Sequence, residues 1–140
     1  MAPTSMSERP PSASVVRFTF DATLDPAPPR GWRSDLLPML RLLGNDQQAE
    51  DVMVAAGELI ANAVEHGGGV AAFHVEGTPE RVCVEVYDRL LSFAGSGRVD
   101  PSRGRGLSMV TALGAEWGWA PSDGGKRVWA TFGQAVSHAA

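Results

Sequence analysis

The longest regular pattern of apolar and polar positions runs from about residue 46 to residue 66. Apolar residues recur there at three- and four-residue spacing, which is typical of one stripe along an α-helix. They are Val52, Ala56, Leu59 and Ala63. Glu58 and Asn62 lie four residues apart and project from one side of the same helix, roughly a third of a turn from the stripe. The pattern predicts a helix that packs its stripe on a sheet and presents Glu58 and Asn62 to a site.

The rest of the pattern predicts two further helices and five strands. Helices are expected at about 28–43 and 104–113, and alternating residues indicate strands at 15–20, 70–76, 81–87, 116–120 and 126–132. Pro38 is expected to kink or split the first helix, and Asp46 is expected to cap the second. This order predicts an α+β fold, a two-layer sandwich of a mixed, mostly antiparallel sheet covered on one face by about three helices.

Length and composition indicate a single domain. The chain has 140 residues, of which 44% are hydrophobic, which is enough for a core and excludes a wholly disordered chain. We expect the domain to span residues 15–133. A disordered tail rich in Pro and Ser is expected at 1–14, and a short C-terminal tail at 134–140.

Charge and the lengths of the apolar runs exclude several classes of function. The net charge is −4, and no basic run is long enough for a nucleic-acid groove, so direct nucleic-acid binding is not expected. The apolar runs are too short to span a membrane, and the first residues lack the apolar core of a secretory signal. The one cysteine, Cys83, alternates with valines and is expected to be a buried, inert thiol. We therefore expect a cytoplasmic protein.

Three segments carry residues suited to nucleotide chemistry. Asn62 offers a neutral oxygen to a hard cation, and Glu58 can take a proton from a nucleophile. The glycines of Gly104-Arg105-Gly106-Leu107 open a helix, where free amides and the helix dipole favour phosphate. Asp88 follows a strand and could accept hydrogen bonds from the amino group of a base. Each segment also has a structural alternative: solvated helix residues, a glycine turn and a turn aspartate, respectively.

In combination, the segments resemble the GHKL ATPase superfamily, in particular the small anti-sigma-factor serine kinases of bacterial regulation. Residues 58–67, ELIANAVEHG, look like the N box of that family, and Val86-Tyr87-Asp88 look like the strand end that carries its G1 aspartate. Residues 103–110, RGRGLSMV, look like its G2 box, and residues 128–132, VWATF, are similar to its closing strand. The resemblance covers about residues 15–132.

The resemblance implies a role for each candidate residue, with ATP and Mg²⁺ as the bound groups. Asn62 would hold the Mg²⁺ that bridges the phosphates, and Glu58 would act as the general base or position the attacking hydroxyl. Asp88 would read adenine, and Thr131 is a weaker candidate for the adenine end, since a strand threonine usually serves packing.

The same resemblance assigns the phosphate end of the site. The amides of Gly104, Arg105, Gly106 and Leu107 would cradle phosphate, with the side chain of Arg105 either adding charge there or remaining solvated. Residues 91–103 would form the nucleotide lid. One departure concerns the G1 box, which usually continues as D-x-G-x-G. Here Arg89 and Leu90 follow Asp88, and Leu90 puts a branched side chain where the base would approach.

Three functions follow from this resemblance. The first is a kinase that phosphorylates a serine or threonine of a small antagonist protein and sequesters a sigma factor, with a homodimer compatible with the family's habit. The second is a catalytically degenerate binding module with weak or no ATP binding, which Leu90 favours. The third is the catalytic half of a histidine kinase. It ranks last because 140 residues leave no room for a dimerisation helix bearing a phospho-acceptor histidine.

Overall fold

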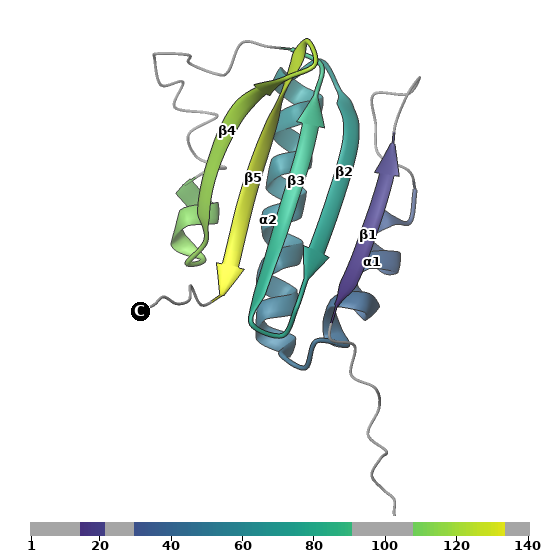
Figure 1. Ribbon diagram of the computed structural model, residues 1–140, viewed down its shortest axis with the longest axis vertical. Coiled ribbons are helices and arrows are strands. Elements are labelled where there is room, and N and C mark those ends of the chain that lie inside the picture. The colour runs from purple at the N-terminus through teal and green to yellow at the C-terminus, as the bar shows by residue number, and fades with distance from the viewer. Residues whose placement is uncertain (1–14, 22–29, 91–107, 134–140) are drawn as a thin grey trace, which may run out of the picture.

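Within the described residues, one five-stranded sheet forms one layer of the protein. The computed structural model describes residues 15–21, 30–90 and 108–133. The strands are β1 (Val16–Asp21), β2 (Val70–Gly77), β3 (Arg81–Asp88), β4 (Glu116–Ser122) and β5 (Gly125–Gly133). They lie in the order β1-β2-β3-β5-β4 (Figure 1). All four pairings are antiparallel, so the described strands contain none of the parallel pairing that a mixed sheet would need.

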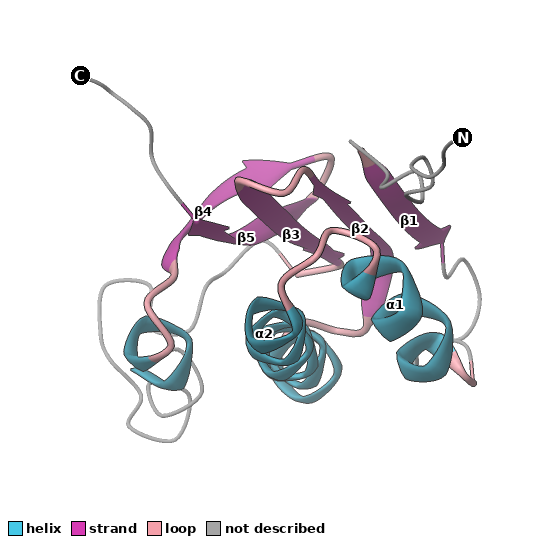
Figure 2. Cartoon of the chain, turned by 90° about the horizontal axis from the view of Figure 1, so that it is seen from below, coloured by secondary structure: helices cyan, strands magenta, loops and turns pink. Residues whose placement is uncertain are grey.

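The helices form the second layer, on one face of the sheet (Figure 2). They are α1 (Trp32–Arg41), α2 (Asp46–His66) and a short helix at residues 108–112. Figure 2 shows α2 between the other two. The predicted stripe of α2 is buried against the sheet, with Val52, Ala56, Leu59 and Ala63 each no more than 2% exposed. The two-layer α+β sandwich predicted from the sequence is confirmed.

The start of α2 differs by one residue from the prediction. Asn45, not Asp46, is the N-cap, and its side chain accepts a hydrogen bond from the backbone N–H of Gln48 at 2.9 Å. Asn45 has the extended backbone that an N-cap needs (φ −133°, ψ 96°), whereas Asp46 is already the first helical residue. At this first helical position, the carboxylate of Asp46 still interacts favourably with the positive end of the helix dipole.

Pro38 does not split α1. The helix runs without a break from Trp32 to Arg41 with Pro38 inside it. A proline in a helix interior costs about 3 kcal/mol. Three buried side chains, Trp32, Leu36 and Leu40, pack this helix against the core. Burying each stabilises by about 1.5–3 kcal/mol, so the tertiary packing outweighs the cost of the proline.

The two faces of the sheet differ in character. In β3, Val82, Val84 and Val86 are buried on the face that carries the helices. The residues between them point to the opposite, uncovered face, because successive side chains of a strand alternate. Cys83 is one of these, and it is half-buried rather than buried as the sequence predicted. In the described part of the chain, no helix has the length and apolar character needed to cross a membrane.

Candidate functional site

Asp88 ends β3 beside the C-terminal end of α2. The backbone N–H of Arg89 donates to the carbonyl oxygen of Gly67 at 2.9 Å. A Cβ added to Gly67 would overlap the carboxylate of Asp88, so only a glycine permits this approach. The sequence placed Asp88 just past the strand, whereas it is the last strand residue and is only 6% exposed.

The three candidate residues are spread along the axis of α2. Asp88 of β3 lies beside the C-terminal end of the helix, and Asn62 and Glu58 lie within the helix. A helix rises 1.5 Å per residue. Asn62 therefore lies about 7.5 Å, and Glu58 about 13.5 Å, along the axis from the end of the helix at Gly67, where Asp88 is held. This order puts the candidate base-reading carboxylate at one end and the candidate general base at the other, with the candidate metal ligand between them.

Glu58 and Asn62 project from the flank of α2 that faces away from α1. Gly57 marks the other flank, because a Cβ added there would lie 2.9 Å from Nη2 of Arg33 in α1. At roughly 100° per residue, Glu58 and Asn62 lie on the opposite side of the buried stripe. That flank is the one toward the short helix of residues 108–112 (Figure 2).

The side chains of Glu58 and Asn62 are available for a ligand. Both are half-buried, and neither has a hydrogen-bond or ion-pair partner among the described residues. The amide oxygen of Asn62 is a ligand type that fits Mg²⁺, which keeps several waters and takes only one or two protein ligands when phosphates supply the rest. The carboxylate of Glu58, one turn away, is then left to act as a base. The arrangement therefore fits the implied metal and nucleotide at Asn62 and Glu58.

Other predicted site residues lie elsewhere. Thr131 is on the uncovered face of the sheet, since its strand neighbours Ala130 and Phe132 are buried on the helix face. It is the register partner of Cys83, and the structure does not bring it together with Asp88. Gly104, Arg105, Gly106 and Leu107, and the predicted lid at 91–103, lie outside the described residues.

Sequence reasoning missed Lys126, which holds Asp88. Its Nζ lies 2.8 Å from Oδ2 of Asp88, and the two side chains are 6% and 4% exposed. The same ammonium donates to the carbonyl oxygen of Leu90 at 3.1 Å. The signal that could have found it is that Lys126 is the chain's single lysine, beside eleven arginines.

Burial raises the pKa of Asp88 above its ordinary value, and the hydrogen bond and charge of Lys126 oppose that shift without cancelling it. A carboxyl whose pKa is higher in the folded state binds its proton more tightly there than in the unfolded chain. Its contribution to stability is therefore fully present below the unfolded value, about 3.9, and is lost as pH rises through the folded value.

We expect the free energy of unfolding of the wild type, relative to Asp88→Asn, to fall as pH rises from about 3.5 toward neutrality. Asparagine does not titrate, so the difference isolates the carboxyl at position 88. Urea denaturation across that pH range measures it. A difference that grows with pH would contradict the prediction, because it would mean that the attraction of Lys126 exceeds the cost of burying the carboxylate.

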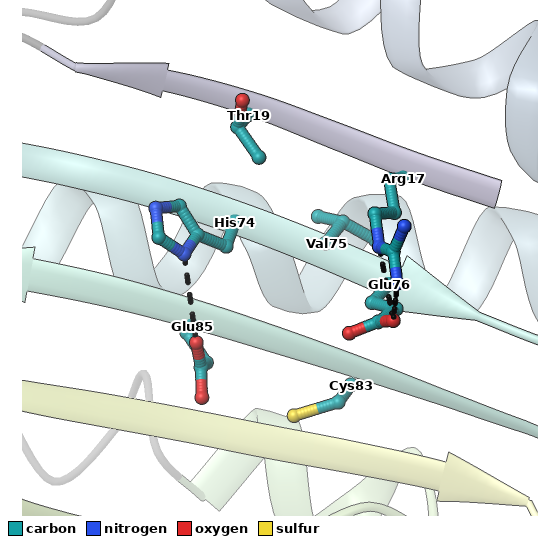
Figure 3. A pocket seen from close by; sticks show the side chains of 7 residues that line it. All are labelled: Arg17, Thr19, His74, Val75, Glu76, Cys83 and Glu85. Carbon is teal, nitrogen blue, oxygen red and sulfur yellow. Dashed lines mark hydrogen bonds and ion pairs between the residues drawn. The ribbon is translucent and has the colours of Figure 1, made fainter.

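A hollow of about 190 Å³ lies on the uncovered face, remote from α2 (Figure 3). Its polar lining residues are Arg17, Thr19, His74, Glu76, Cys83 and Glu85. Nδ1 of His74 lies 3.7 Å from Oε1 of Glu85, and Nε of Arg127 donates to Oε2 of Glu85 at 2.9 Å. Burial, and then the charge of Glu85, raise the pKa of the Cys83 thiol, which keeps it protonated and a poor nucleophile near neutral pH.

The sequence matches the family model described as the histidine kinase-like ATPase domain over residues 24–132. The chain belongs to this family, and the resemblance to GHKL ATPases is confirmed at that level. Membership implies ATP binding, usually with Mg²⁺. A comparison with curated proteins found no match. The narrower assignment to anti-sigma-factor kinases stays a prediction.

Proposed function

We propose that this histidine kinase-like ATPase is a regulatory protein kinase. In this proposal it binds ATP with Mg²⁺ and transfers the γ-phosphoryl group to a serine or threonine of a small antagonist protein. It sequesters a sigma factor when the antagonist is absent. The observation that carries the proposal is the pair Glu58 and Asn62, half-buried on one flank of α2 without a partner among the described residues.

Three site residues that the structure describes each have one task in the proposed reaction. The amide oxygen of Asn62 is a ligand for Mg²⁺, which when bound neutralises phosphate charge. Glu58, one turn away, accepts the proton of the attacking hydroxyl. Asp88 accepts a hydrogen bond from the amino group of adenine. Phosphoryl transfer needs mainly positioning and charge neutralisation, and this set supplies both with few residues.

We expect Glu58→Ala to leave nucleotide binding largely intact and to lower phosphoryl transfer by about 10²-fold or more, as for a lost general base. The measurement follows labelled phosphate from [γ-³²P]ATP to a small protein that co-purifies with the full chain from its host cytosol. Glu65→Ala is the matched control, because Glu65 is an exposed carboxylate two turns further along α2 and should leave the rate unchanged.

The stability of the label to acid separates the competing reactions. A phosphoserine or phosphothreonine survives acid, whereas a phosphohistidine loses its phosphate. Acid-stable label on the partner supports the proposed kinase, and acid-labile label supports the catalytic half of a histidine kinase. If nucleotide binds but no partner is labelled by the wild type, the kinase proposal is wrong.

The second candidate is a binding module that has lost catalysis, with weak or no ATP binding. Two observations favour it. Lys126 already engages Asp88, and Leu90, whose Cγ would lie 3.1 Å from a Cβ added to Gly68, stands where the G1 pattern expects a glycine. In a module of this kind, neither Glu58→Ala nor Asn62→Ala changes capture of the sigma factor, and restoring glycine at position 90 raises ATP affinity from a low baseline.

A further inference from the structure

Lys126 and Asp88 form a buried ion pair at the end of the sheet next to α2. They are direct register partners across β5 and β3. They are also the two charged residues that are buried in the described part of the chain, at 5% and 6% exposure. Removing two charges from water is expensive. A lysine usually buries only its aliphatic stem and keeps its ammonium in solvent. The buried ammonium of Lys126, the chain's single lysine, departs from that pattern and needs a physical explanation.

The hydrogen-bond positions on Asp88 are largely taken. Oδ2 lies 2.8 Å from Nζ of Lys126. Oδ1 accepts from the backbone N–H of Leu90 at 3.2 Å. Gly67 closes a further side, because even a Cβ there would overlap the carboxylate. Each oxygen of Asp88 therefore already accepts one donor, and its side chain is only 4% exposed, so an amino group of a purine has little open surface to approach while Lys126 stays in place. An ammonium offers the same N–H donor chemistry as that amino group.

We propose that Lys126 is an internal competitor for the nucleobase, so that a purine with a 6-amino group reaches Asp88 only when Lys126 leaves it. The inference rests on the proposed function, because it takes Asp88 as the residue that faces the base. Lys126 is then a specificity-determining residue. It lowers the affinity for ATP and reduces the preference for a 6-amino over a 6-oxo purine.

The reduced preference follows from the chemistry of the ammonium. A 6-oxo purine presents a carbonyl oxygen, which cannot donate to Asp88 and so gains no hydrogen bond from displacing Lys126. It therefore binds with the ion pair left in place. A 6-amino purine must first displace Lys126, whose flexible four-carbon stem allows that movement at the cost of a buried, charge-assisted contact.

The decisive comparison is between Mg·ATP and Mg·inosine triphosphate, titrated by calorimetry into the wild type and into Lys126→Met. Loss of the lysine removes interactions that lower the pKa of Asp88, so this pKa is higher in Lys126→Met. The titration is therefore run near pH 8, to favour the ionised carboxylate in both proteins. We expect the wild type to bind the two nucleotides within about threefold of each other. Lys126→Met should bind ATP about tenfold more tightly than the wild type and prefer it to inosine triphosphate by a similar factor, the size of one charge-assisted hydrogen bond.

Two variants separate this role from a purely structural one. Lys126→Arg keeps the charge opposite Asp88 and should not gain ATP affinity. Asp88→Asn combined with Lys126→Met replaces the ion pair by neutral groups of similar size, which avoids a lone buried carboxylate, and should bind both nucleotides without preference. A merely destabilising effect of Lys126→Met would shift both nucleotides together and leave their ratio unchanged.

A measurement on the wild type covers the case in which Lys126→Met does not fold. Because the chain has a single lysine, reductive methylation with ¹³C-formaldehyde labels one ε-amino group besides the α-amino group. We expect saturating Mg·ATP to speed labelling of Lys126, whereas Mg·inosine triphosphate should not. Equal labelling rates with and without ATP would overturn the competitor role.

The outcomes distinguish this inference from the proposed function. If the wild type already prefers ATP strongly and Lys126→Met gains nothing, Lys126 is not a competitor, although nucleotide binding stands. If no variant binds either triphosphate, the proposed function fails and this inference fails with it.

Discussion

Replacing Asn62 with alanine is expected to abolish Mg²⁺-dependent nucleotide binding while the chain stays folded. Asn62 is half-buried and has no partner among the described residues, and alanine has the higher helix propensity, so the fold loses little. The variant loses the neutral oxygen that the proposed site offers to the cation. Calorimetric titration with ATP, in the presence and absence of Mg²⁺, measures the effect.

The control for Asn62→Ala is Gln47→Ala, which removes another carboxamide from the same helix. Nε2 of Gln47 donates to Oδ1 of Asp51 at 3.0 Å, near the opposite end of α2 from Asp88. Nucleotide binding should be unchanged in this control, and thermal unfolding should show both variants folded. Retention of full Mg²⁺-dependent binding by Asn62→Ala would show that the cation is held elsewhere.

The parts of the fold that sequence reasoning predicted are those set by local periodicity. The apolar stripe of the 21-residue helix α2 recurs at three- and four-residue spacing from Val52 to Ala63, and no other regular structure fits that spacing. The strands predicted at 116–120 and 126–132 also placed the β4–β5 turn. In the structure, Asp123 and Gly124 have the positive φ values, 46° and 83°, that a two-residue hairpin turn requires. Asn45 and Asp46 are adjacent and are equally good N-cap residues, so the sequence could not decide between them. The cap was therefore assigned to Asp46 instead of Asn45.

The part that sequence could not supply is pairing between distant strands. Asp88 and Lys126 meet because of the register between β3 and β5, which no local pattern encodes. The position of Thr131 on the uncovered face was predictable, because Val128, Ala130 and Phe132 alternate with it and mark the buried face. A residue out of phase with that set cannot face α2.

Gly125 shows how two adjacent glycines with the same sequence signal serve different physical needs. The strands predicted at 116–120 and 126–132 leave both Gly124 and Gly125 in the connection between them. Gly124 has a φ of 83°, and a Cβ there would meet nothing within 4 Å. Gly125 has no positive φ, but a Cβ there would overlap the carbonyl oxygen of Asp88 and lie 3.1 Å from Cα of Arg89. It is needed for the close approach of β5 to β3.

We therefore expect Gly125→Ala to lower the free energy of unfolding by at least about 3 kcal/mol, the upper end for overpacking, because backbone rather than a flexible side chain must move. Gly124→Ala should cost only about 1 kcal/mol, for a left-handed residue in open space. Urea denaturation measures both. The displaced backbone carries Asp88, so Gly125→Ala should also weaken ATP binding at temperatures where it remains folded, whereas Gly124→Ala should not. Equal losses of stability in the two variants would contradict this prediction. They would mean that β5 can move away from β3 at Asp88 without a cost in free energy, so that the close contact at Gly125 does not position the carboxylate of Asp88.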